Sequence, residues 1–121
     1  ALVDYLSQRP EVSQILHPGR AGHPGHVIFA RDFQGASGLF ALVLDDFDED
    51  RLARFLDALE LFGMGYSWGG FESLALPMQP VRTAGKPFQL RPDQRLLRLH
   101  AGLESPDDLV ADLERAFTAA R

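Results

Sequence analysis

The chain has 121 residues, is 45% hydrophobic and carries a net charge of −5, with 17 acidic against 12 basic residues. This length and apolar content predict one domain (1–121) with a genuine core, and the acidic balance argues against a nucleic-acid partner. No apolar run approaches the roughly 20 residues that cross a bilayer. Cysteine is absent, which excludes disulfides, thiolate chemistry and cysteine-ligated zinc.

The first half of the chain predicts a helix and two strands with a less regular connection between them. Apolar residues at helical spacing predict a helix over Leu2–Leu6, and the short segment Val12–Leu16, with β-branched Val12 and Ile15, predicts a half-buried strand. Gly22–His26 is typical of a loop, and Val27–Phe33 is consistent with a short helix. The continuous apolar run Leu39–Leu44 predicts a central strand that is buried on both faces.

The middle of the chain predicts a helix and then a short strand. The carboxylates of Asp48–Asp50 suit the start of a helix, where the helix dipole favours negative charge. One apolar stripe supports this helix and consists of Leu52, Phe55, Leu56 and Leu59. Ser73–Leu76 predicts a short strand that Pro77 ends. The stretch 81–92 has no period and is expected to be a flexible loop that carries Lys86.

The last third predicts a strand over Arg95–His100 and a final helix. Ser105 as N-cap, Pro106 at the first helical position and Asp108 as its capping-box partner indicate where this helix begins. Its buried stripe consists of Leu109, Leu113, Ala116 and Phe117. Segregated elements of this kind predict an α/β fold of the two-layer α+β type, with a small, mostly antiparallel sheet and helices packed on one face.

The segment Gly63–Gly70 has four glycines in eight residues, and between them stand Tyr66, Ser67 and the only tryptophan, Trp68. It is not a dinucleotide-binding fingerprint, because Trp68 stands where the third glycine would fall. Two interpretations remain open. The segment is either a kinked edge strand whose aromatic side chains fill the core, or a binding loop whose backbone a ligand can approach closely.

Arg98 is the second candidate, near the end of the predicted strand Arg95–His100 and between two leucines. A guanidinium there could hold a carboxylate through two parallel hydrogen bonds. The alternative is a structural ion pair with one of the 17 acidic residues.

The remaining polar clusters predict neither a metal site nor a catalytic residue. His17, His23 and His26 lie within ten residues of one another, but no nearby cysteine or carboxylate completes a ligand set. His100 is interpreted as a hydrogen-bonded histidine at a strand end, and the acidic run 45–50 as a solvated helix start. No nucleophile–base–orienter set is present at a recognisable spacing, and Ser67 has no histidine adjacent in the sequence.

Taken together, these motifs resemble the C-terminal domain of the Cys/Met-metabolism enzymes that use pyridoxal 5′-phosphate (PLP). The segments that carry the resemblance are Phe62–Leu74 and Leu97–Glu104, followed by 107–109 and 112–113, with 17–18, 31–33 and 35–40 earlier in the chain. Within the family, the run 66–70 resembles the cystathionine β-lyase branch. The γ-lyases and γ-synthases more often have a small or aliphatic residue where Trp68 stands.

The resemblance implies a fold-type I PLP enzyme, a carbon–sulfur lyase of methionine biosynthesis and transsulfuration. Its reaction would be β-elimination of L-cystathionine to homocysteine, pyruvate and ammonia. The resemblance also implies that Arg98 binds the α-carboxylate of the substrate and that Ser67 helps to bind it and positions the catalytic lysine. Trp68 would form a wall of the substrate pocket, and Tyr66 would be a neighbouring pocket or packing residue.

The family places the cofactor lysine, the phosphate-binding residues and the ring-stacking aromatic in a larger preceding domain. Lys86, the only lysine here, matches no PLP-lysine motif. We therefore expect a truncated chain that by itself neither binds PLP covalently nor cleaves cystathionine. The family also implies a cytoplasmic homotetramer, and the isolated fragment could dimerise. The alternatives are a γ-lyase or γ-synthase of the same family, or a stand-alone carboxylate-binding or interaction module without catalysis.

Overall fold

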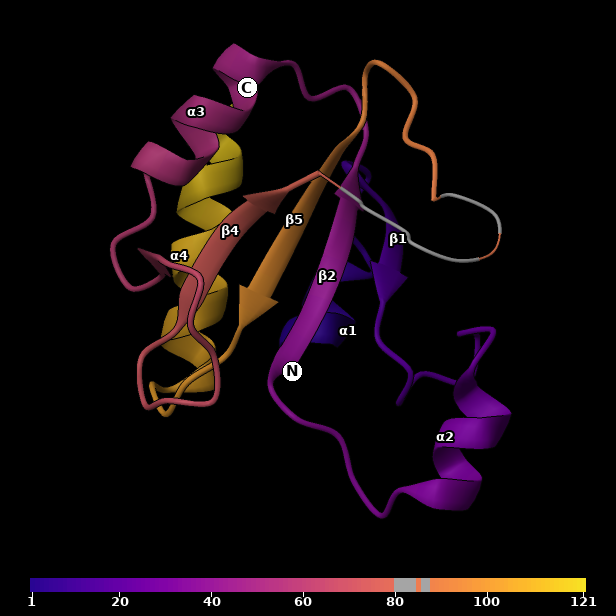
Figure 1. Ribbon diagram of the computed structural model, residues 1–121. Helices are drawn as coiled ribbons and strands as arrows, with labels where there is room; N and C mark the ends of the chain where they lie inside the picture. The colour runs from indigo at the N-terminus through magenta and orange to yellow at the C-terminus, as the bar shows by residue number, and fades with distance from the viewer. Residues whose placement is uncertain (80–84, 86–87) are drawn as a thin grey trace.

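The structure is a computed structural model that describes residues 1–79, 85 and 88–121, and within these residues it has a five-stranded sheet and four helices. The elements are α1 (Leu2–Leu6), β1 (Val12–Leu16), α2 (His26–Asp32), β2 (Leu39–Leu44), α3 (Glu49–Asp57), β3 (Gly63–Met64), β4 (Leu74–Met78), β5 (Arg95–His100) and α4 (Pro106–Ala119). The strands are ordered β1-β2-β5-β4-β3 (Figure 1), and only the β3–β4 pair is parallel. The predicted α/β fold with a mostly antiparallel sheet is confirmed.

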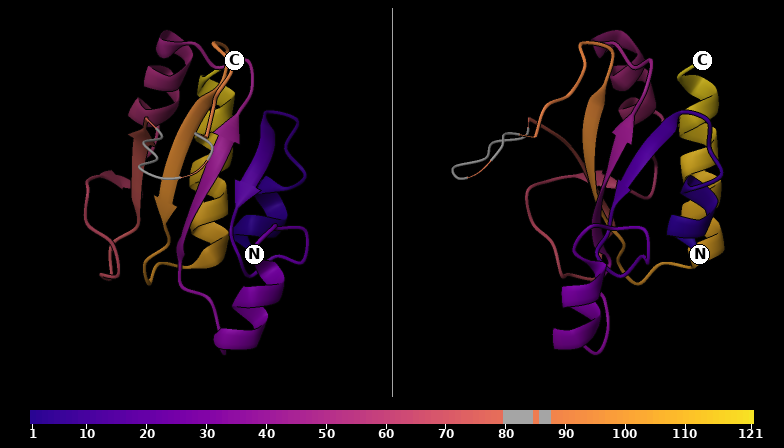
Figure 2. Two further views of the ribbon diagram at one scale, coloured as in Figure 1. Left: turned by 45° about the vertical axis from the view of Figure 1, so that its right-hand side comes forward. Right: turned by 90° about the vertical axis from the view of Figure 1, so that its right-hand side faces the viewer.

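The helices that pack against the sheet all lie on one of its two faces. α1 and α4 lie against one face (Figure 2), and α3 packs beside α4, where the rings of Phe55 and Phe117 are 4.9 Å apart. The segment 27–33 does contain a helix, α2, but none of the residues of α2 is buried. The core therefore lies between the sheet and the layer formed by α1, α3 and α4.

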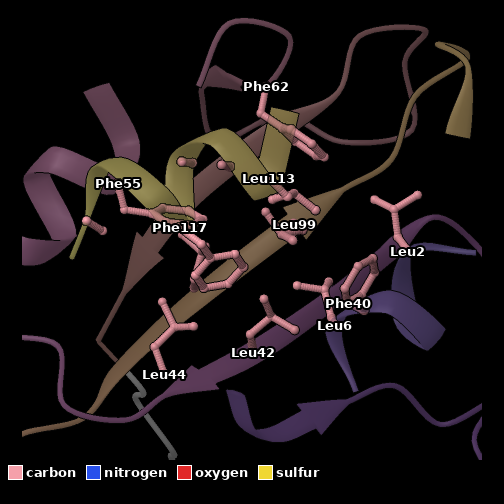
Figure 3. Close-up of a cluster of buried hydrophobic side chains, with 14 of the residues drawn as sticks. Leu2, Leu6, Phe40, Leu42, Leu44, Phe55, Phe62, Leu99, Leu113 and Phe117 are labelled. Carbon is pink, nitrogen blue, oxygen red and sulfur yellow. The ribbon is translucent and has the colours of Figure 1, made fainter. Parts of the chain in front are cut away.

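The register of the central strands decides which residues face this core. Phe40 pairs with Leu99, and Leu42 pairs with Leu97, and all four side chains are buried. They pack with Leu113 and Phe117 of α4 (Figure 3). Because side chains alternate along a strand, the residues between them point to the face without helices. There Ala41 pairs with Arg98, and Leu39 pairs with His100.

Two predictions about strands are wrong in part. β2 is not buried on both faces throughout, since Val43 is 2% exposed but Leu39 and Ala41 are only half-buried on the face without helices. Pro77 does not end its strand, because β4 continues to Met78. β3 pairs with β4 only at Leu74 and Ala75. Pro77 therefore lies on an unpaired edge of the described sheet, where the N–H that proline lacks would make no hydrogen bond between strands.

The helix starts also differ from prediction at one place. Asp48 does cap α3, and its carboxylate accepts a hydrogen bond from the Arg51 N–H at 2.7 Å. Ser105 precedes α4 and Pro106 opens it, but the predicted capping box with Asp108 is absent from this described helix, because Ser105 makes no side-chain cap bond. Half of the predicted loop 81–92, Lys86 included, lies outside the described residues. No helix in the described part of the chain is long and apolar enough to cross a membrane.

Candidate functional site

Arg98 binds the backbone of the glycine-rich loop. Its side chain lies half-buried on the face of β5 without helices. Its Nη2 atom donates to the carbonyl oxygens of Gly65 at 3.1 Å, Tyr66 at 2.9 Å and Ser67 at 3.0 Å. Within residues 1–79, 85 and 88–121, no acidic side chain forms an ion pair with Arg98. The alternative of a structural ion pair therefore finds no support in the described part of the chain.

His100 binds the same loop two residues further along the strand. It is 5% exposed, and its Nε2 atom lies 3.1 Å from the Gly69 nitrogen and 3.2 Å from the Gly70 oxygen. The predicted hydrogen-bonded histidine is confirmed. Gly69 has a φ of +80°, in the left-handed region that glycine adopts without strain, and this turns its N–H toward the imidazole.

A buried network around Ser73 holds the downstream end of the loop. The Ser73 hydroxyl donates to Glu104 Oε2 at 2.7 Å and accepts from the Gly102 N–H at 2.8 Å, while the Ser73 N–H donates to Glu104 Oε1 at 2.9 Å. Burial would raise the pKa of Glu104, but the hydrogen bonds from Ser73 outweigh it and hold that pKa below its ordinary value. Leu103 N–H also donates to the Phe71 carbonyl at 2.8 Å.

Asp112 of α4 holds the upstream end. Its carboxylate is 1% exposed and accepts from the N–H groups of Glu60 at 2.9 Å, Leu61 at 2.9 Å and Phe62 at 3.2 Å. Arg115 also donates to it. This role of Asp112 is not predicted from the sequence alone. The position of Asp112 on the buried stripe of α4 could have indicated this role, because burying a charge without a partner costs free energy.

Between these anchors, the side chains of the loop face solvent. Tyr66 is 81% exposed, Trp68 is 63% exposed, and Ser67 is also exposed. The edge-strand interpretation is right for the two residues of β3, but Tyr66 and Trp68 do not fill the core. The structure therefore brings Arg98 to the backbone of the loop, and it leaves the three loop side chains available on the surface.

The three clustered histidines each make a separate local contact. His23 Nδ1 accepts from the Gly25 N–H at 3.0 Å, and His26 Nδ1 lies 2.9 Å from the Pro18 oxygen. His17 contacts the ring of Phe40 edge-on. In the part of the chain that the structure describes, no three potential ligands gather in a way that could hold a metal ion.

The chain is similar to known proteins over nearly its whole length. A family model for Cys/Met metabolism PLP-dependent enzymes matches residues 1–118. The chain is 43% identical to cystathionine β-lyase MetC of Escherichia coli K12, with 96% of the chain and 30% of that protein covered. It is 46% identical to a putative cystathionine β-lyase of Rhizobium johnstonii, with 98% of the chain and 31% of that protein covered.

A solved structure shows the same arrangement of the fold. Cystathionine γ-synthase from Xanthomonas oryzae pv. oryzae, in complex with aminoacrylate and cysteine, matches with a TM-score of 0.80 at 30% identity, over 98% of this chain and 32% of that one. The chain thus spans about a third of the length of the proteins that it resembles. With the family match over residues 1–118, these similarities show that the chain belongs to the Cys/Met metabolism family of PLP-dependent enzymes.

Proposed function

We propose that this chain is the C-terminal, substrate-carboxylate-binding domain of a PLP-dependent carbon–sulfur lyase. Its reaction would convert L-cystathionine and water to homocysteine, pyruvate and ammonia by β-elimination. The observation that carries the proposal is Arg98, a half-buried guanidinium beside an exposed loop, with no acidic partner among the described residues. Similarity to two cystathionine β-lyases at 43% and 46% identity supports the reaction.

Arg98 would bind the α-carboxylate of the amino-acid substrate. A guanidinium fixes the orientation of a carboxylate as well as its charge, because it donates two parallel hydrogen bonds. The Ser67 hydroxyl, on the loop that Arg98 holds, would add a donor to the same carboxylate. The exposed indole of Trp68 would form a wall of the pocket, with Tyr66 as its neighbour.

The described residues do not fit a covalently bound PLP, because none of them is a lysine and Lys86 lies outside them. PLP supplies an electron sink for bond breaking in enzymes of this family. We propose that the rest of the enzyme, which this chain does not span, holds the cofactor. The domain described here would then contribute substrate binding, and the complete active site would require both parts.

The assay that tests the reaction uses the whole enzyme with L-cystathionine and measures pyruvate and α-ketobutyrate separately. Pyruvate with homocysteine is the expected result. α-Ketobutyrate with cysteine would instead assign γ-elimination, the alternative that similarity to a cystathionine γ-synthase favours. If neither product forms, the result favours the non-catalytic carboxylate-binding module.

The role of Arg98 is tested by Arg98→Lys, with Arg95→Lys as a matched control. Arg95 lies on the same strand but donates to the carbonyls of Pro92 and Gln94, away from the loop. Arg98→Lys is expected to lower kcat/KM for L-cystathionine by about 30-fold or more, corresponding to about 2 kcal/mol for one partner of a charge pair. Equal kinetics in the two variants would contradict the assignment.

A further inference from the structure

We propose that His100 is a positioning residue, which keeps the substrate-binding loop in place while Arg98 binds the substrate carboxylate. This inference rests on the proposed function of Arg98. The His100 side chain is buried and lies two residues from Arg98 on the same face of β5. Its ring contacts only backbone atoms of the loop.

The imidazole can hold the loop in either of its neutral forms. With the proton on Nε2, the ring donates to the Gly70 oxygen at 3.2 Å and accepts from the Gly69 N–H at Nδ1, 3.5 Å away. With the proton on Nδ1, Nε2 accepts from the Gly69 N–H at 3.1 Å. A ring nitrogen that lacks a proton accepts, and one that carries it donates. His100 therefore supplies an acceptor for Gly69 in both forms.

Packing does not provide an alternative anchor at this part of the loop. Residues 66–70 are all exposed. A Cβ atom built on Gly69 or Gly70 would meet no atom within 4 Å in the described structure. Since few contacts with neighbouring side chains restrain these residues, their position depends on the polar anchors, Arg98 on one side of Trp68 and His100 on the other.

Carboxylate binding by Arg98 creates the need for this second anchor. An arginine binds a carboxylate bidentately through Nη1 and Nη2, or through Nε and Nη2, so both edges use a hydrogen of Nη2. In this structure the two hydrogens of Nη2 already serve three loop carbonyls, those of Gly65, Tyr66 and Ser67. A bidentate substrate must displace at least one of them. The contacts of His100 do not involve Arg98, so they persist when this exchange occurs.

The experiment compares His100→Leu and His100→Gln in the whole enzyme. Leucine fills the buried space but cannot bind Gly69 or Gly70, whereas the glutamine amide has both a donor and an acceptor. Hydrogen exchange followed by mass spectrometry reports on peptides that cover residues 66–71, and KM is measured with L-cystathionine. The urea midpoint of each variant checks that the enzyme is folded.

We expect His100→Leu to speed exchange in 66–71 and to raise KM about tenfold, the scale of one lost positioning contact. His100→Gln should restore both to within about threefold of the parent enzyme. Unchanged exchange in His100→Leu would overturn the anchoring role. Faster exchange with unchanged KM, while Arg98→Lys lowers kcat/KM, would overturn positioning but leave the function of Arg98 intact. If Arg98→Lys leaves kcat/KM unchanged, the proposed function itself fails, and the inference fails with it.

Discussion

Gly102 lies in a turn that packs against the backbone of residues 71–72, just after the glycine-rich loop. A Cβ atom at Gly102 would lie 2.7 Å from the carbonyl carbon of Glu72 and closer still to the Phe71 oxygen. Backbone atoms cannot move aside as a flexible side chain can. We expect Gly102→Ala to lower the free energy of unfolding by about 1–3 kcal/mol, the usual cost of overpacking, as measured by urea denaturation. The matched control is Gly22→Ala, because nothing lies within 4 Å of a Cβ atom at Gly22.

Glu104, which binds Ser73 beside the same turn, should make the stability of the fold depend on pH. Its pKa is held below the ordinary value of about 4.3, because hydrogen bonds from Ser73 outweigh the effect of burial. A lowered pKa in the folded state means that the stabilisation is complete above the ordinary pKa and is lost as the pH falls through the lowered one. Glu104→Gln should therefore be less stable at neutral pH and should lose less stability on acidification. Urea titrations at several pH values measure this, with the exposed Glu114→Gln as control.

At the scale of elements, one buried side chain of α4 holds the backbone of the segment after α3. Asp112 accepts three backbone N–H bonds from residues 60–62. Asp112→Ala leaves these donors without the carboxylate, and we expect a loss of about 2–4 kcal/mol in the free energy of unfolding. Asp108→Ala, at an exposed position in the first turn of the same helix, should cost less than about 1 kcal/mol. Equal losses in the two variants would contradict this account.

β5 joins the core and the site in a single element. Leu97 and Leu99 face the core, and Arg98 and His100 face the loop. A shift of the pairing by one residue would exchange these two sets, which would bury a charge and expose two leucines. The pairing of β5 with β2 over all six residues therefore fixes the site and the core together.

At the scale of the whole molecule, two apolar surfaces remain uncovered by the described residues. One is the α2 surface, where Val27 is 79% exposed and Ile28 60% exposed, and the other surrounds Trp68. Exposed apolar surface favours association, so we expect the isolated chain to self-associate. Replacing Val27 and Ile28 by serine should reduce association in sedimentation velocity, while stability changes by less than about 0.5 kcal/mol. If association is unchanged by these substitutions and lost in Trp68→Ser, the second surface is responsible.

The pattern of apolar residues was sufficient to predict most of the sheet. The bounds predicted for β1, β2 and β5 agree with the structure, because turn residues delimit each of these short segments. The burial of β2 and the length of β4 were predicted less well, since they depend on which neighbouring elements cover each face and edge. The contacts of Arg98 and His100 with the loop join residues about 30 positions apart. Their shared face follows from alternation along β5, but the path of the loop does not.

The loop is anchored through its backbone atoms and not through its side chains. Arg98 contacts three carbonyl oxygens, and His100 contacts one N–H and one carbonyl. None of these contacts depends on which side chain stands at positions 66, 67 or 68. Natural selection can therefore change those three side chains without loosening their support. A fold of this kind can give rise to enzymes with different substrates while its architecture is inherited unchanged.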